Sequence, residues 1–296
     1  MDDFLSQSLT TDKTISPGFS ELQQLFLTQF PPPSLSKEDI RTLKAAHAFF
    51  LSHKTAVFIC LGFLSLPYCY AAEPGVKTLY LSDRFRNQTK ERLKNTAEFV
   101  ESVFELGEPK RESKVEKLII SVRMGHSFFR RAVIDRIPKD LGLPVNQEDM
   151  AGTHLAFSFL VLRGLRHLGF TISSTEAETW LKAWKIVGLR LGIDEGLLPI
   201  HQKDALALSK AIEVRHFRFS QEGYELTQKL TTVLTEFFGE EKDVKDLMKF
   251  LLGKDVSGIL GLDVTETVKK DQVKWKILAR LKNPEVWAGL FLKNRT

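Results

Sequence analysis

Arg123 and His126 are the residues of this chain whose types and spacing most clearly suggest chemistry. They stand three positions apart in Ser121–Ser127, inside an apolar stretch with helical periodicity. At that spacing both side chains leave one face of a helix, one turn apart. An arginine and a histidine in apolar surroundings are costly unless a partner satisfies them. A group that offers a metal to the imidazole and acidic groups to the guanidinium would satisfy both, whereas on a helix edge both side chains would reach water.

Other motifs with known chemistry are missing from the sequence or stand alone. A di-iron bundle needs two Glu-x-x-His motifs, and Glu213–His216 is the single copy, which favours a solvated helix face. Zinc-protease, P-loop, nucleophile-elbow and dinucleotide-binding signatures do not occur. Cys60 and Cys69 are too few for a disulfide scaffold or a zinc framework. Both lie in one apolar run, where a reduced cysteine acts as a small hydrophobe.

Composition and charge set broad limits on partners and location. The net charge of +5, with a pI near 9.0, is too mild to indicate a nucleic-acid partner. The acidic start of the chain does not resemble a secretion signal. The run Thr55–Ala72 reaches the lower length limit of a membrane span, but Pro67 and several hydroxyl groups favour a buried helix. We therefore expect a cytoplasmic protein.

Helical periodicity throughout the chain predicts an all-α fold with a single large domain and a buried cofactor pocket between its helices. The helix of Arg123 and His126 should span 115–137 and end before Pro138. Asn146 should cap a helix over 150–168. Further helices are expected at 20–30, from 36 through 50, and at 55–72, 90–106, 174–191, 205–217, 221–238, 243–252 and 274–292, with a turn at Glu73–Gly75 before a short element at 78–81. The expected organisation is an N-terminal extension with a short helix (1–35), the main helical domain (36–262) and a C-terminal basic amphipathic helix (263–296).

Short motifs in a fixed order resemble one helical family. They are Leu66-Pro-Tyr68, Arg92-x-x-Asn-Thr96, Val122-Arg-x-x-His126, Asn146–Thr153, and Trp184–Ile193 followed by Leu197-Leu-Pro199. Together they resemble the rubber oxygenases (latex clearing proteins) and the fungal ER-bound oxygenases of the mpaB type. The resemblance covers roughly Ala45 to Pro199.

The resemblance implies a haem b site inside the all-α domain. It assigns the proximal iron ligand to His126 and further haem contacts to Arg123 and Thr153. A neutral imidazole is a good iron ligand, and a guanidinium suits a propionate. The helix with Arg92, Asn95 and Thr96 corresponds to the distal wall, where a single helix face would present all three side chains.

The sequence departs from the family pattern on the distal side. Rubber oxygenases carry a lysine where this chain has Asn95, and Lys94 points about 100° away on a helix. The glutamate that acts as a base in the family has Glu73 as its approximate counterpart. The missing secretion signal favours an intracellular isoprenoid or lipid-like substrate rather than rubber.

The leading hypothesis is a haem b oxygenase that cleaves a carbon–carbon double bond of a hydrophobic isoprenoid with dioxygen. One alternative is a haem-binding or haem-sensing protein of the same fold without catalysis, which Asn95 favours. Another is a peripheral protein that associates weakly with a membrane surface through the basic helix of 263–296.

Overall fold

The computed structural model describes residues 17–82, 86–107 and 112–262, and there the chain folds as a single all-α domain, as predicted. The α-helices are α2 (Pro17–Gln29), α3 (Lys37–Cys60), α4 (Leu66–Tyr70), α5 (Glu73–Tyr80), α7 (Thr89–Val103), α8 (Glu112–Val133), α9 (Gln147–Phe157), α10 (Phe159–His167), α11 (Ser174–Leu191), α12 (Gln202–His216), α13 (Gln221–Phe238), α14 (Glu241–Leu252) and α15 (Lys254–Ile259). The expected basic helix at 274–292 lies outside the described residues, so its role stays a prediction.

A continuous helical run from α3 through a π-helical turn (Leu61–Ser65) into α4 forms the centre of the domain. Ser36 and Asp39 form a capping box at its start. By length and composition, Lys37–Tyr70 is the one described helix that could cross a membrane, and 67% of its most apolar window is buried inside the fold. A core helix passes the same test, and the run indeed packs against α10, α11 and α14.

Aromatic side chains fill the space between α3 and α11. The ring of Trp180 lies 5.3 Å from that of Phe49 and 4.9 Å from that of Phe104, between centroids. Trp184 packs edge-on to Phe104 at 5.8 Å. Rings that meet at tilted or perpendicular angles contribute beyond their buried area. This cluster fixes α11 against α3, and α11 in turn packs against α8.

Three local predictions about helix boundaries were wrong. The helix expected to reach residue 137 ends at Val133, where residues 134–136 form a turn. Glu73–Gly75 begins α5 rather than forming a turn, because Pro74 suits the first turn of a helix, where its missing N–H is not needed. The helix expected over 150–168 is broken at Ser158, where α9 ends and α10 begins. The Ser158 hydroxyl donates to the carbonyl of His154, and its own carbonyl accepts the indole N–H of Trp180.

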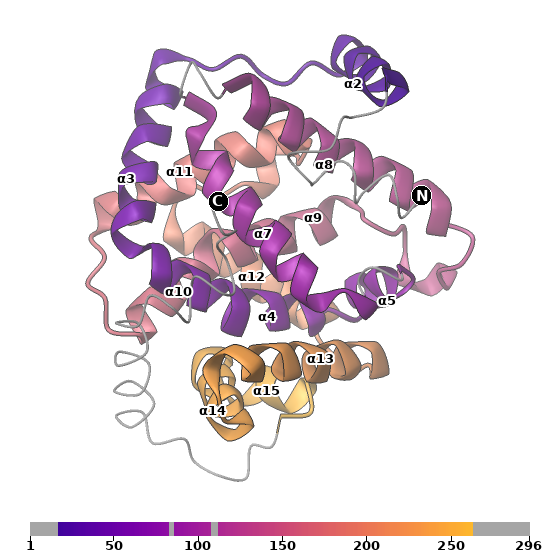
Figure 1. The fold of residues 1–296 in the computed structure, drawn as a ribbon, viewed down its shortest axis with the longest axis vertical. Helices are drawn as coiled ribbons and strands as arrows, with labels where there is room; N and C mark the ends of the chain where they lie inside the picture. Colours follow the sequence, from indigo (N-terminus) through magenta and orange to yellow (C-terminus); the bar gives the residue numbers. More distant parts are fainter. Residues whose placement is uncertain (1–16, 83–85, 108–111, 263–296) are drawn as a thin grey trace.

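The arrangement of the helices places α2 and α13–α15 at opposite ends of the molecule (Figure 1). α13, α14 and α15 form a layer below α4 and α5, and α13 packs against both of these helices. α2 lies at the other end, over α8, and an extended segment connects it to α3. α7, α8 and α9 lie between the two ends and carry all the predicted site residues except Glu73, which lies on α5.

Candidate functional site

A cavity of about 200 Å³ lies where α2, α8, α9 and the end of α11 meet. Its lining combines aromatic and aliphatic side chains with polar and cationic groups. The lining residues are Phe26, Phe30, Arg123, His126, Ser127, Arg130, Gln147, Met150, Leu191 and Gly192. None of them is acidic, and two are arginines, so the cavity favours an anion with an apolar body.

His126 reaches this cavity from α8, as the spacing of the sequence motif predicted. Its Nδ1 atom is enclosed and has no hydrogen-bond partner among the described residues. Burial and, to a smaller extent, the nearby charge of Arg130 lower the pKa of His126 to about 4. The ring is therefore neutral at physiological pH, as a metal-binding imidazole must be.

Arg123 lines the same cavity one turn earlier and is held by the N-terminal segment. Its Nη1 donates to the carbonyl of Phe30 at 3.2 Å, and its guanidinium lies 5.5 Å from the ring centre of Phe26. Gly192, the left-handed residue that ends α11 (φ 84°), passes so close that a Cβ there would stand 2.8 Å from Arg123 Nε. Burial lowers the pKa of the Arg123 guanidinium.

Arg130 is a third cationic or basic side chain on this face, and the sequence reasoning missed it. It follows His126 by four residues, which is the spacing that places two side chains on one helix face. Its Nε donates to the carbonyls of Pro144 and Val145, both at 3.2 Å. Val145 has a φ of +52°, unique among the described non-glycine residues and unfavourable for a β-branched side chain. Arg130 therefore stabilises a strained turn beside the cavity.

Thr153 and Arg92, from different helices, both act on the thiol of Cys69. Thr153 contacts the thiol of Cys69, and the charge of Arg92 also acts on that thiol. Burial raises the pKa of Cys69 to about 12 despite both neighbours. Arg92 itself donates to the hydroxyl of Tyr70 at 2.8 Å. Thr153 has an exposed side chain and does not line the His126 cavity, whereas Met150, one turn before it, does.

Asn95 and Thr96 lie on α7 as the distal-wall hypothesis requires, but neither lines the cavity of His126. Asn95 is buried, and its Nδ2 has no hydrogen-bond partner among the described residues. An enclosed amide N–H₂ without a partner is costly. It marks a place where a polar ligand atom would be stabilised. Thr96 is half-buried.

Glu73 is engaged in ion pairs, which conflicts with the role of a free base. Its carboxylate accepts from Lys77 at 2.8 Å and from Arg218 at 3.1 Å. Each of the two carboxylate oxygens of Glu73 is thus already occupied by a protein donor. The structure therefore gives no support to Glu73 as the distal base.

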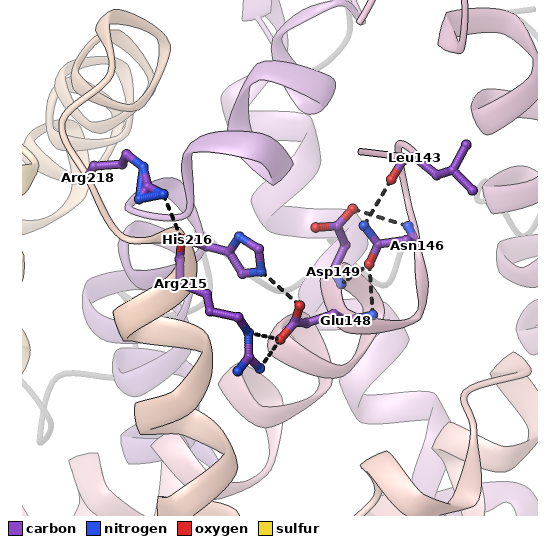
Figure 2. A network of polar contacts seen from close by, with 7 residues as sticks. All are labelled: Leu143, Asn146, Glu148, Asp149, Arg215, His216 and Arg218. Carbon is purple, nitrogen blue, oxygen red and sulfur yellow. Dashed lines mark hydrogen bonds and ion pairs between the residues drawn. The ribbon is translucent and has the colours of Figure 1, made fainter. Parts of the chain in front are cut away.

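Arg218 also connects Glu73 to a second polar network, which Figure 2 shows between α9 and the end of α12. Arg218 donates to the carbonyl of Arg215, and Glu148 accepts from both Arg215 and His216. These bonds hold the pKa of Glu148 below its usual value, against the opposing effect of burial. His216 and Glu213 are half-buried and bonded, so the expected solvated Glu213–His216 face was wrong.

Comparison with known proteins identifies the family. Residues 52–281 match the family model described as "ER-bound oxygenase mpaB/B'/Rubber oxygenase, catalytic domain".

The chain belongs to this family.

A curated relative, the rubber oxygenase of Streptomyces sp. (strain K30), is 24% identical over 122 residues. The aligned part is 40% of this chain and 30% of the relative, so the similarity spans less than a third of that protein. Among solved structures, a latex clearing protein in the closed state matches with a TM-score of 0.74 and 18% identity. That match covers 95% of this chain and 78% of the other, and it establishes a shared fold.

All seven residues singled out from the sequence lie inside the part that matches the mpaB/rubber oxygenase family. α2 lies outside it, although Phe26 and Phe30 form one wall of the cavity. No pattern in the sequence connects α2 with α8, because their contact depends on how a proline-containing segment returns over the domain. Among the described residues there is no group of three His, Cys, Asp or Glu side chains that could hold a metal by itself.

Proposed function

We propose that this protein is an oxygenase that binds haem b, with His126 as the axial ligand of the iron. The observation that carries the proposal is the cavity in which a neutral imidazole and two guanidinium groups face the same space. Membership of an oxygenase family supports the enzymatic part of the proposal. The rubber oxygenase relative supports carbon–carbon double bonds of isoprenoids as the target.

The residues of the cavity fit the parts of a haem that need a protein partner. His126 has an enclosed ring without a protein acceptor or donor at Nδ1, and burial keeps it neutral. Arg123 and Arg130 would hold the propionates, since a guanidinium pairs well with a carboxylate. A volume of about 200 Å³ is below the ~300–1,000 Å³ of typical ligand pockets. The cavity accordingly accounts for the anchoring groups rather than for the whole ring.

A bound haem would supply the redox chemistry that activates dioxygen. The chain would contribute orientation and an apolar environment. Phe26, Phe30, Met150 and Leu191 contribute apolar walls beside the polar lining, and the two guanidinium groups would pair with an anion there. In the overall reaction both oxygen atoms of dioxygen enter the product, and one carbon–carbon double bond becomes two carbonyl groups.

The distal side favours a second candidate, a haem-binding protein without oxygenase activity. Asn95 replaces the lysine of the rubber oxygenases and cannot donate a charged hydrogen bond or ligate iron as an amine would. The ion pairs of Glu73 remove the expected base as well. The buried Nδ2 of Asn95 still provides a neutral donor, so we place the oxygenase first.

We also propose that the substrate is hydrophobic and lipid-like, as the name of the rubber oxygenase relative suggests. Haem-loaded protein should consume dioxygen in the presence of a short polyisoprene and yield products that end in carbonyl groups. Mass spectrometry of the products with ¹⁸O₂ would show label in both carbonyl groups. Bound haem without oxygen consumption would favour the non-catalytic candidate, and a protein that binds no haem would contradict both.

A further inference from the structure

The N-terminal segment of residues 17–30, called the α2 lid below, covers the cavity of Arg123 and His126. It consists of α2 and Phe30. It lies on α8 and is set apart from the rest of the domain in Figure 1. The lid and the segment that follows it contact the body of the domain at Gln23, at Phe26 and Phe30, and at Pro33.

One buried side chain of the lid, Gln23, attaches it to α8 through hydrogen bonds. Gln23 is only 4% exposed, and its Nε2 donates to the hydroxyl of Ser121 at 2.6 Å. The same Nε2 also donates to the carbonyl of Lys117 at 3.4 Å. That carbonyl accepts a shorter hydrogen bond, of 2.7 Å, from the hydroxyl of Ser121. Ser121 thus keeps a partner when Gln23 leaves, so the surface of α8 beneath the lid has its polar groups satisfied in an open state.

The end of the lid contacts the cavity directly. Phe26 and Phe30 pack on each other with ring centres 5.1 Å apart, and both line the cavity. Arg123 donates to the carbonyl of Phe30 and lies over the ring of Phe26. Movement of the lid would therefore remove one wall and release Arg123 in the same step.

The segment Pro31–Pro33, which connects the lid to α3, is held firmly, whereas the lid itself has exposed apolar side chains. The carbonyl of Pro33 accepts a hydrogen bond from Arg190, which is 4% exposed and paired with Glu116 at 2.9 Å. Pro31–Pro33 is stiff, since proline fixes its own φ. In the lid, by contrast, Leu25 is 55% and Phe30 49% exposed. Elements with few buried apolar contacts open locally at low free energy.

We propose that the α2 lid opens as a unit about the Pro31–Pro33 segment and thereby controls access to His126 and Arg123. In the closed state it excludes water from the imidazole and orients the Arg123 guanidinium. In the open state it admits the group that these two residues bind. The identity of that group as haem rests on the proposed function, whereas the opening itself does not.

Chemical modification of His126 tests the opening without any ligand. Diethyl pyrocarbonate acylates neutral imidazole, and mass spectrometry reports the rate at each histidine of the full-length protein without haem. Gln23→Ala should accelerate the modification of His126 about three- to tenfold, the effect of losing one buried hydrogen bond. Gln24→Ala is the matched control. Gln24 is the same residue type as Gln23 and lies next to it in α2, but its side chain is exposed, whereas that of Gln23 is buried against α8.

His154 serves as the internal reference, since it is buried away from the lid and donates to Trp184. Its rate should stay low in all three proteins. An unchanged His126 rate in Gln23→Ala, an equal rise in Gln24→Ala, or a parallel rise at His154 would each overturn the lid. Haem uptake by the wild type and Gln23→Ala, followed by absorbance, should then be faster in the variant. A protein that takes up no haem while His126 responds as expected would contradict the proposed function and leave the lid supported.

Discussion

One neutral histidine and two arginines share a small cavity with both polar and apolar walls, and their electrostatics differ in origin. Burial disfavours the charged form of His126, and Arg130 adds repulsion of the same sign. The arginines stay charged because their intrinsic pKa lies far above neutral pH. The site thus offers a metal-binding lone pair and anion-binding charges at the same pH.

Gly192→Ala tests the position of Arg123. A Cβ at this left-handed position would stand 2.8 Å from Arg123 Nε, so the guanidinium must move. We expect the variant to lose about 1–3 kcal/mol of unfolding free energy through backbone strain and the clash. It should also bind haem about tenfold more weakly, the loss expected for one charge-assisted hydrogen bond. Denaturant titration and haem titration measure the two effects.

Gly253→Ala is the control for this prediction. Gly253 also has a φ of +84°, but no atom lies within 4 Å of its would-be Cβ. It should therefore lose stability through strain and bind haem as the wild type does. Equal weakening of haem binding in both variants would contradict the role given to Arg123.

Three helix N-termini follow from local sequence patterns, although other helix boundaries were predicted wrongly. Ser36 with Asp39, Asn146 with Asp149, and Ser173 with Glu176 all form capping boxes as the local pattern indicates. These motifs depend on residues three positions apart, so a short window contains the whole interaction. The break at Ser158 escaped prediction because its causes lie elsewhere, in Trp180 and in the bond from Ser65 to the carbonyl of Ala156.

Gly164→Ala tests the close crossing of α10 and α3. In a solvent-exposed helix this change would stabilise by up to about 1 kcal/mol. Here a Cβ would stand 2.6 Å from Cys60 Sγ and 3.0 Å from Leu64 Cδ2, so we expect a loss of about 1–3 kcal/mol from overpacking. Chemical denaturation gives the value. Cys60→Ala in the same chain should reduce the loss, because it removes the sulfur atom.

Gly258→Ala, in α15 with no neighbour within 4 Å, should by comparison be neutral or stabilising. A Gly164→Ala protein at least as stable as the wild type would show that α10 and α3 do not pack as closely as described.

Acid should weaken the contact between α9 and α11. His154 donates through Nε2 to the carbonyl of Trp184, and burial lowers its pKa from 6.5 to about 4. Between these pH values the unfolded chain binds a proton that the folded chain does not. The unfolding free energy is therefore highest above pH 6.5 and falls as the pH drops toward 4. The slope reaches about 1.4 kcal/mol per pH unit for each such histidine.

Denaturant titrations of the haem-free protein between pH 4.5 and 7.5 would measure this slope. His154→Phe should reduce the slope by about 1.4 kcal/mol per pH unit, the contribution of one proton. An unchanged slope in His154→Phe would contradict the buried, neutral state of this ring.

At the scale of the whole molecule, the sequence predicted the all-α class and the joint exposure of Arg123 and His126 to one space. It did not predict what else surrounds that space. Arg130 was visible in principle, since it is four residues from His126 on the same face. Phe26 and Gly192 were not, because they reach the cavity only through the return of α2 over α8 and the left-handed end of α11.

The same limit applies to Glu73. The family resemblance suggested Glu73 as the counterpart of the distal base, whereas its partner Arg218 is 145 positions away and could not be found from the sequence. Pairings over such separations depend on tertiary packing, here that of α5 against α13 and of the segment after α12. Fold class and local caps can therefore be predicted from the chain alone, while the ionisation and accessibility of site residues require the packed structure.

Haem titration of three proteins tests the central claim most directly. Haem-free wild type, His126→Gln and His154→Gln are titrated with haemin, and the Soret absorbance reports binding. The two replaced histidines are both buried at Nδ1 and have similarly low pKa values, but His126 alone lines the cavity. We predict saturable binding by the wild type and by His154→Gln, and its loss in His126→Gln. Undiminished binding by His126→Gln, or no binding by the wild type, would contradict the account.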